Sequence, residues 1–378
     1  MAKAIMHKEK AKRGKMDFTF LSLVLILLTI GLVMLFSASY AYSYSRFGNS
    51  YKFITRQAIF AVIGVGVMLW VSRWDYHVFK KFAWLIFGGV NAVLVLLLIL
   101  PPQVKEMNVK RWLVIAGTTI QPSEFAKFAI VLIFSSLIAS NIKQIKEFKF
   151  IAFLVALLGV TCALIVLEPH LSATILVFAI GIVLLVVGGL PKGYIIGGFG
   201  IGAGALAILV FTGVIGYASD RLKYWIDPWS SPTKEGYQTI QSLLAIGSGG
   251  LLGRGIGQSR QKYLWVPEPH NDFIFSIVCE EVGLIGAMVV IILFCLLVWR
   301  GFYIAMRSPD RFGALMCIGL TFQVGLQALL NILVVTNTMP NTGISLPFFS
   351  YGGTSLLLLL AEMGIVLSVS RSANMEKT

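Results

Sequence analysis

The chain contains 378 residues, of which 57% are hydrophobic and only 13% are charged, whereas a soluble domain carries roughly 25% charged residues. This composition excludes an average soluble globular protein and indicates a chain surrounded mainly by lipid. The formal net charge of +14 raises the question of nucleic-acid binding. The basic residues, however, cluster in the first sixteen positions and in short segments between apolar runs, as cytoplasmic charge does in membrane proteins. We therefore expect no nucleic-acid partner.

The apolar runs predict an all-α polytopic membrane protein with about ten transmembrane helices, since one span needs roughly 20 mainly apolar residues. In chain order the runs lie near residues 18–40, 54–71, 82–100, 123–140, 150–167, 172–190, 194–217, 273–299, 312–336 and 351–370. The first run is too long for a secretory signal and lacks an obvious small-residue cleavage site. We interpret it as a permanent span.

The distribution of Lys and Arg predicts the orientation. With a cytoplasmic N-terminus, the cytoplasmic segments hold eighteen basic residues and the short outer loops hold six, so both termini are expected in the cytoplasm. The chain then divides into a basic cytoplasmic tail (1–16), a single transmembrane domain (17–371) and a second cytoplasmic tail (372–378). The largest extracytoplasmic loop, 218–272, lies between the seventh and eighth spans.

This topology limits the chemistry. No cytoplasmic segment between spans is much longer than ten residues, so a nucleotide-binding domain has no place, and chemistry on the outer face must use activation stored in the substrate. A lipid-linked pyrophosphate is such a substrate.

The four cysteines lie in apolar runs without metal-ligand spacing, so we expect no disulfide framework and no metal site formed by the protein. The glycine run 247–257 indicates either flexible turns or close backbone approach to a headgroup.

Charged side chains at membrane depth are functional candidates, because each costs about 3 kcal/mol on insertion scales. The acids at such positions are Glu124, Glu168, Glu280, Glu281 and Glu362. Glu124 and Lys127 are three residues apart and so share a helix face. Either they neutralise each other inside the bundle, or they contact a pyrophosphate or sugar. Glu168-Pro169-His170 marks a turn, and His170 either belongs only to that turn or lines a watery cavity.

Asp272 precedes an apolar run at its outer end. It can cap that helix, or it can present a carboxylate at the mouth of a cavity, where it takes a proton from a hydroxyl nucleophile. Both roles can hold together. Aromatic residues of the outer loops serve as an interfacial belt or stack on sugar faces. Basic residues near them, including Arg111, Arg221, Arg260 and Lys262, are suited to phosphate.

Several motifs occur in order along nearly the whole chain. They are Arg111-Trp112-Leu113, Gln121-Pro122-Ser123-Glu124 with Lys127, Gly236-Tyr237-Gln238 with Gln241-Ser242, residues 245–250, Pro267-Glu268 with His270, Asp272-Phe273-Ile274-Phe275 with Glu280-Glu281, and Leu346-Pro347 with residues 350–355. In this combination the chain resembles the shape, elongation, division and sporulation (SEDS) family. The segments 168–172 and 339–347 are more similar to its division and sporulation branch (FtsW and SpoVE) than to its rod-shape branch (RodA).

The resemblance implies a bacterial inner-membrane enzyme that polymerises lipid II into peptidoglycan glycan strands beside a class B penicillin-binding protein and other division or elongation proteins. In that family the aspartate of the HxDFIF motif is treated as catalytic, and here it is Asp272. The substrate-binding residues that we expect are Arg111, Glu124, Lys127, Arg221, Arg260, Lys262, Glu268, His270 and Ser350. A divalent cation, Mg or Mn, is expected only in company with the substrate pyrophosphate.

The expected reaction is an inverting glycosyl transfer on the outer face, with Asp272 as the base. Two other functions stay open at this point. A lipid II flippase would use the same cavity to bind and move headgroups, and a scaffold of the division machinery would use its loops only to bind the transpeptidase.

Overall fold

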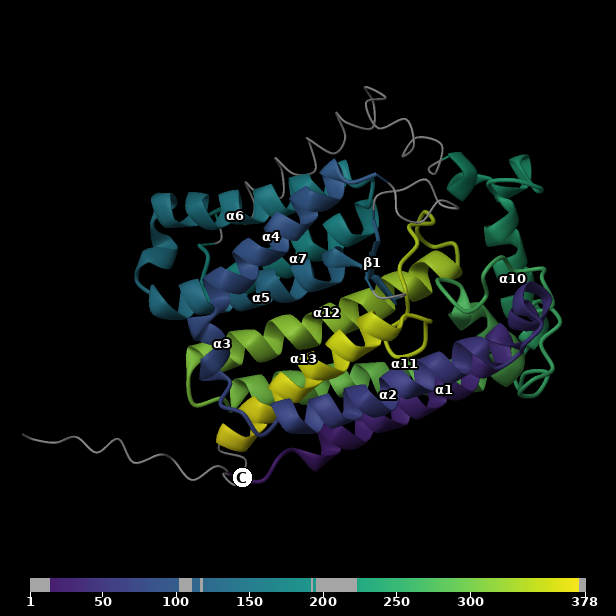
Figure 1. Cartoon of the computed structure of the whole chain (residues 1–378), viewed down its shortest axis with the longest axis horizontal. Helices are drawn as coiled ribbons and strands as arrows, with labels where there is room; N and C mark the ends of the chain where they lie inside the picture. The colour runs from purple at the N-terminus through teal and green to yellow at the C-terminus, as the bar shows by residue number, and fades with distance from the viewer. Residues whose placement is uncertain (1–13, 102–110, 116–117, 192, 195–222, 374–378) are drawn as a thin grey trace, which may run out of the picture.

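The computed structural model describes residues 14–101, 111–115, 118–191, 193–194 and 223–373, and within them the chain is a bundle of long, roughly parallel or antiparallel helices (Figure 1). The long helices are α1 (Phe18–Phe47), α2 (Lys52–Val71), α4 (Ala83–Ile99), α5 (Pro122–Ser140), α6 (Phe148–Leu167), α7 (Leu171–Gly188), α11 (Ile274–Met306), α12 (Arg311–Val335) and α13 (Gly353–Ser372). The short elements are α3 (His77–Lys81), β1 (Leu113–Ile115), β2 (Thr118–Ile120), η1 (Gln144–Lys146), η2 (Pro228–Ser230) and α10 (Tyr237–Gly249).

Nine of the ten predicted apolar runs correspond to described helices. Eight of these are long and apolar enough to cross a membrane, and α4 is a shorter apolar helix. The remaining run, near 194–217, lies almost entirely outside the described residues. The mainly helical polytopic fold is confirmed, while the total of ten spans, the cytoplasmic position of both termini and the tail boundaries stay predictions.

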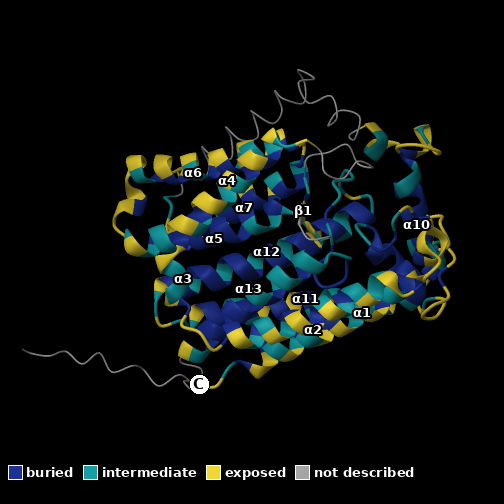
Figure 2. Ribbon diagram, in the orientation of Figure 1, coloured by how far each residue is buried: buried dark blue, intermediate teal, exposed yellow. Residues whose placement is uncertain are grey.

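The helices differ in how much of their surface the bundle covers. α5, α12 and α13 form its centre, and most of their residues are buried, whereas α2, α4 and α6 present exposed apolar faces (Figure 2). Exposed side chains such as Val62, Leu85 and Val155 are apolar, as expected for helix surfaces that face lipid tails. The polar residues that the bundle buries are therefore shielded from lipid by the peripheral helices.

Two polar junctions join α1 to α11. Asp17 caps α1, accepting a 2.8 Å hydrogen bond from the Phe20 amide, and its carboxylate pairs with Arg300 Nη2 at 2.7 Å. Twenty residues further along α1, Ser37 Oγ donates to Glu281 Oε1 at 2.6 Å. At 1.5 Å per residue the junctions are about 30 Å apart, which matches the thickness of a bilayer's hydrocarbon core. The two junctions are thus separated by about one hydrocarbon-core thickness along α1.

The predicted outer loop contains α10, and the segment after it packs on α11. Gly283 interrupts α11 with left-handed φ of 67°, which frees backbone groups for the loop. Leu284 N donates to Gly250 O, and Gly255 N donates to Glu281 O, both at 2.9 Å. A Cβ atom at Gly253 would collide with the Glu281 carbonyl. The glycine run is needed for turns and for close approach to this helix.

Strands β1 and β2 form an antiparallel hairpin in the register Leu113↔Ile120 and Ile115↔Thr118. The hairpin leads directly into α5, and Thr354 Oγ1 at the start of α13 donates to Thr119 O at 2.9 Å. It is thereby fixed beside the starts of α5 and α13, at the end of the bundle where the polar residues gather.

Candidate active site

A cavity of about 470 Å³ opens at one end of the bundle. It lies where α5, α7, α11 and α13 begin and α12 ends, on the side where β1 and α10 are seen in Figure 1. Six residues predicted from the sequence line it: Arg111, Glu124, Lys127, Glu268, Asp272 and Ser350. Segments distant in the sequence therefore bring most of the predicted site residues together.

Asp272 is half-buried and lines the cavity. α11 begins at Ile274 and its N-cap residue is Phe273, so Asp272 does not occupy the capping position that the sequence also allowed. Gly343 lies beside the carboxylate, because a Cβ atom built on it would be 3.1 Å from Asp272 Oδ2. Gly343 has a left-handed φ of 65°, which favours glycine. The backbone of the 341–347 segment thus comes close to the carboxylate.

Glu124 and Lys127 form an ion pair in the first turns of α5, with 2.9 Å between Lys127 Nζ and Glu124 Oε1. The lysine side chain is 1% exposed and the glutamate 17%. Lys127 Nζ also donates to Gln327 Oε1 at 2.7 Å, and Gln327 Nε2 donates to Ser345 O at 3.0 Å. The two residues neutralise each other, which was the first alternative, and both also line the cavity. Contact of the pair with a pyrophosphate or sugar, the second alternative, stays a prediction.

Glu362 and Gln323 form the next polar pair along the buried centre. Gln323 Nε2 donates to Glu362 Oε2 at 3.0 Å, and both side chains are among the cavity-lining residues. Within the described residues, Glu362 Oε1 and Gln323 Oε1 have no hydrogen-bond partner. Glu362 was notable in the sequence as an acid at membrane depth, whereas no sequence signal distinguished Gln323 or Gln327 from other helix residues.

Arg111 lies at the cavity edge and is held by the turn between α6 and α7. Its Nε donates to Glu168 O at 3.3 Å, and its Nη2 donates to Pro169 O. The Glu168 carboxyl is fully buried, and its oxygens have no hydrogen-bond partner among the described residues. Burial raises the pKa of Glu168 to about 8, although the nearby charge of Arg111 opposes the shift.

His170 follows that turn and lines the cavity. Its ring contacts the opening residues of α5, with 3.2 Å between His170 Nδ1 and Ser123 Oγ and 3.4 Å to Gln121 Nε2. The turn and the cavity-lining role, which were alternatives from the sequence, are both present. His170 is thus a cavity residue that the predicted site did not include.

His270 does not line the cavity. Its side chain is 3% exposed and packs against the rings of Phe53, Tyr42 and Tyr351, with centroids 4.3, 4.8 and 6.0 Å away. Burial lowers the pKa of His270 to about 4, so the ring is neutral in this aromatic cluster. The structure therefore does not place this predicted substrate-binding residue among the residues that line the cavity.

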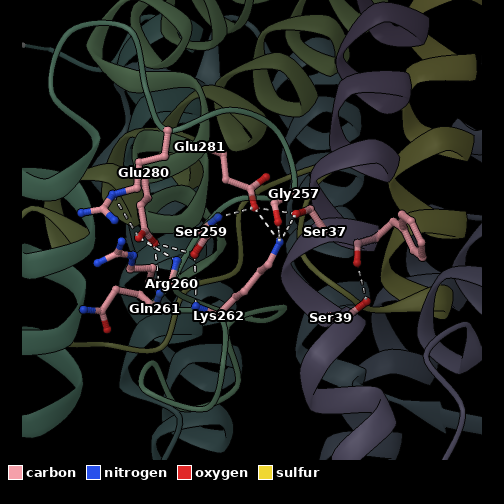
Figure 3. Close-up of polar contacts among 11 residues, drawn as sticks. Ser37, Ser39, Gly257, Ser259, Arg260, Gln261, Lys262, Glu280 and Glu281 are labelled. Carbon is pink, nitrogen blue, oxygen red and sulfur yellow. Dashed lines mark hydrogen bonds and ion pairs between the residues drawn. The ribbon is translucent and has the colours of Figure 1, made fainter.

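Lys262 and Arg260 lie in a separate network on α11 (Figure 3). Lys262 is 3% exposed, and its Nζ contacts Glu281 Oε1 at 3.0 Å, Ser37 Oγ at 3.0 Å and Gly257 O at 2.6 Å. This ammonium is already compensated and closed off from solvent. The expectation that Lys262 lines the substrate cavity is corrected, because loop folding pairs it with Glu281.

Glu280 anchors the same loop through its carboxylate. It accepts hydrogen bonds from Ser259 Oγ, from Arg260 N at 2.9 Å and from Gln261 N at 3.3 Å (Figure 3). The side chain of Arg260 is exposed and does not line the cavity. Arg221 lies outside the described residues. Of the four basic residues predicted to meet phosphate in the outer loops, the structure places only Arg111 in the cavity.

Arg56, near the start of α2, is a cation that sequence reasoning missed. It lines the cavity, where its side chain hydrogen-bonds Tyr351 and its charge acts on that phenol. Its only signal in the sequence was a basic residue inside the outer end of a predicted span. Ser350, by contrast, was predicted and lines the cavity, with its hydroxyl accepting from Leu346 N at 2.7 Å and donating to Asn271 O at 2.8 Å.

A family model described as cell cycle protein (FtsW, RodA, SpoVE) matches residues 18–375. The chain is 36% identical over 327 residues to a protein named probable peptidoglycan glycosyltransferase FtsW from Geobacter sp. (strain M18), covering 86% of this chain and 88% of that protein. It is 37% identical over 335 residues to stage V sporulation protein E of Bacillus subtilis (strain 168), covering 86% and 89%. These names agree with the predicted resemblance to the division and sporulation branch.

Solved structures share the fold. One is described as "Structural coordination of polymerization and crosslinking by a peptidoglycan synthase complex", with a TM-score of 0.78 and 28% identity over 96% of this chain and 99% of that chain. Another is the rod shape determining protein RodA of Thermus thermophilus, with a TM-score of 0.70 and 26% identity over 96% and 98%. The helical bundle is thus a fold that this chain shares with a chain of a peptidoglycan synthase complex and with a rod shape determining protein.

Proposed function

The chain belongs to the cell cycle protein family of FtsW, RodA and SpoVE, and from this premise we propose that it is a peptidoglycan glycosyltransferase of the bacterial cytoplasmic membrane. It joins the disaccharide units of lipid II on the outer membrane face. The observation that carries the proposal is the carboxylate of Asp272 in a cavity between membrane-length helices that also holds Arg56, Arg111 and Lys127. A base and cations in one cavity suit a transfer that releases pyrophosphate.

In the proposed reaction Asp272 takes the proton from the 4-hydroxyl of the acceptor N-acetylglucosamine. The hydroxyl oxygen forms a bond to the anomeric carbon of the donor sugar as the bond from that carbon to undecaprenyl pyrophosphate breaks. The configuration inverts because a single displacement occurs. The pyrophosphate leaves as an anion and needs no general acid, but its developing charge needs nearby cations.

The charged side chains that line the cavity determine how well the protein alone can neutralise the leaving pyrophosphate. The lining contains four carboxyl side chains and three cations: Glu124, Glu268, Asp272 and Glu362, and Arg56, Arg111 and Lys127. Lys127 is paired with Glu124, and Arg111 is bonded to two carbonyls. The described residues therefore offer little surplus positive charge. This favours a divalent cation, Mg or Mn, that accompanies the pyrophosphate and supplies charge neutralisation.

The ligands of such a cation would come mainly from the oxygens of the substrate pyrophosphate. Within the described residues, no group of three or more His, Cys, Asp or Glu side chains is arranged to hold a metal ion. The proposed cation is consequently a companion of the substrate, with the described residues contributing fewer than three such side chains. Polymerisation should then depend on added Mg or Mn in proportion to lipid II rather than to protein.

Purified protein incubated with fluorescently labelled lipid II tests the proposal. The expected result is long glycan polymer from the wild type and none from Asp272→Asn, with both proteins equally folded. Asp227→Asn is the matched control, because this aspartate caps η2 in the outer loop and lies outside the cavity. Polymer from Asp272→Asn at the wild-type rate would contradict the assignment of the base.

The same variants, measured in two further assays, separate the two rival functions. A flippase predicts headgroup translocation in liposomes without polymer from any variant, and a scaffold predicts that Asp272→Asn supports growth in complementation.

We also propose a class B penicillin-binding protein as partner, supported by the shared fold with a chain of a peptidoglycan synthase complex. Its addition is expected to raise the polymerisation rate without changing the requirement for Asp272.

A further inference from the structure

Three consecutive carbonyl oxygens lead up to Asp272, and each accepts one hydrogen bond from elsewhere in the bundle. The bonds are Tyr351 N to His270 O at 2.9 Å, Ser350 Oγ to Asn271 O at 2.8 Å and Asn331 Nδ2 to Asp272 O at 2.7 Å. Two of the three donors are side chains and can be changed by substitution. The backbone that carries the carboxylate is therefore fixed at three successive peptide units.

The two side-chain donors also hold a second loop. Asn331 Nδ2 donates to Ile344 O at 2.5 Å, and Ser350 Oγ accepts from Leu346 N at 2.7 Å. Each side chain thus bridges the backbone before α11 to the 344–346 segment, which also lines the cavity. Asn331 is completely buried and Ser350 is 9% exposed, so the bridges are shielded from competition by bulk water.

The distance between these two loops sets the surroundings of the Asp272 carboxylate. Gly343 precedes the residue that Asn331 binds, and a Cβ atom at Gly343 would be 3.1 Å from Asp272 Oδ2. A shift of either loop would move this backbone relative to the carboxylate. Misplacement of a reacting group by about 1 Å can reduce a rate about 100-fold.

We propose that Asn331 and Ser350 are positioning residues that set the place of the Asp272 carboxylate by bridging its backbone to the 344–346 segment. This inference rests on the proposed function, in which Asp272 is the base. It reassigns Ser350, which the sequence suggested as a substrate contact, because both hydrogen bonds of its hydroxyl are made within the protein. Neither side chain exchanges a proton with substrate.

Kinetics of lipid II polymerisation by Asn331→Leu and Ser350→Ala test this role. Leucine preserves the volume of asparagine and removes its donor. Each variant is expected to lower kcat at least 30-fold and to leave KM for lipid II within threefold of wild type. Ser350→Thr retains the hydroxyl and should recover kcat to within about fivefold of wild type, which a loss of packing alone would not predict.

Matched controls carry the same changes at the other end of the bundle. Ser72 is fully buried and its hydroxyl donates to Leu69 O at 2.7 Å, while Asn141 Nδ2 donates to Leu137 O at 3.0 Å. Ser72→Ala and Asn141→Leu each remove one side-chain hydrogen bond, local to the ends of α2 and α5, without touching the cavity. Both are expected to keep kcat within twofold of wild type.

Each other outcome overturns the inference. A raised KM with unchanged kcat would return Ser350 to substrate binding, and a kcat within threefold of wild type in both variants would remove the positioning role. If the variants lose folded yield while the folded fraction turns over at the wild-type rate, the bridges are only structural. Failure of the proposed function is separate, because then wild type makes no polymer or Asp272→Asn polymerises normally.

Discussion

Among the described residues two Lys–Glu pairs are buried, and they differ both in how they could be recognised and in their access to the cavity: the spacing of the first pair is visible in the sequence, whereas the second forms only when a loop folds onto α11. Lys127 pairs with Glu124 at 2.9 Å and Lys262 pairs with Glu281 at 3.0 Å. The first pair lines the cavity and leaves its glutamate 17% exposed, whereas the second is closed, with side chains 3% and 0% exposed. A buried pair is thus accessible to substrate only where one partner reaches a cavity.

The closed pair should control folding rather than chemistry. Lys262→Met leaves the Glu281 charge buried without its ammonium, and loss of one partner of a buried pair costs about 3–5 kcal/mol. We expect a large fall in folded yield and in the thermal unfolding temperature of the detergent-solubilised protein. The double variant Lys262→Met with Glu281→Gln should recover part of this loss, since no unpaired charge remains.

A Lys262→Met protein that unfolds at the wild-type temperature but makes no polymer would contradict this interpretation. It would place the lysine back among the substrate contacts. Lys234→Met is the control, because this lysine is exposed in the outer loop and its removal should change neither quantity.

The Lys127–Glu124 pair, which lines the cavity, should affect activity more than folding. Lys127→Met is expected to reduce the polymerisation rate about 100-fold, or about 2.7 kcal/mol, because the cavity loses one of its described cations. Lys127→Met also leaves Glu124 without its partner and should therefore lower stability. The double variant Glu124→Gln with Lys127→Met should recover this stability but not the activity. Steady-state kinetics and thermal unfolding of the same preparations check both statements. Recovery of activity in the double variant would mean that this pair is only structural.

The sequence was sufficient for the described helices and for six of the residues that line the cavity. Apolar runs predicted nine described helices because a span must be continuous and apolar. Glu124 and Lys127 were found because charge is rare in such runs. Sequence reasoning misplaced Lys262, because pairing with Glu281 depends on how a loop folds back onto α11. Asn331 and Gln327 were missed because an amide in a helix has no distinguishing pattern until its partners are known.

Glu168 differs from Glu124 and Glu281 because its buried carboxyl group has no lysine partner among the described residues. Burial raises its pKa from 4.5 in the reference state to about 8, so the folded protein holds a proton that the unfolded chain releases above pH 4.5. Stability should therefore fall as pH rises from 4.5 to 8. Glu168→Gln should unfold at a higher temperature than wild type at pH 8.5 and show little difference at pH 4.5. Equal unfolding temperatures of the two proteins at pH 8.5 would argue against a buried, neutral Glu168.

For His270 we expect the smallest change in stability, and its dependence on pH has the opposite sign to that of Glu168. Burial against Phe53 lowers its pKa from 6.5 to about 4, so the unfolded chain takes up a proton that the folded protein resists. The stabilising contribution is complete above pH 6.5 and is lost as pH falls towards 4. His270→Phe keeps a ring in the aromatic cluster and cannot be protonated, so its unfolding temperature should depend less on pH between 4 and 6.5. Because the ring does not line the cavity, KM for lipid II should stay within threefold of wild type. A larger rise in KM at pH 7 would show that His270 contacts substrate after all.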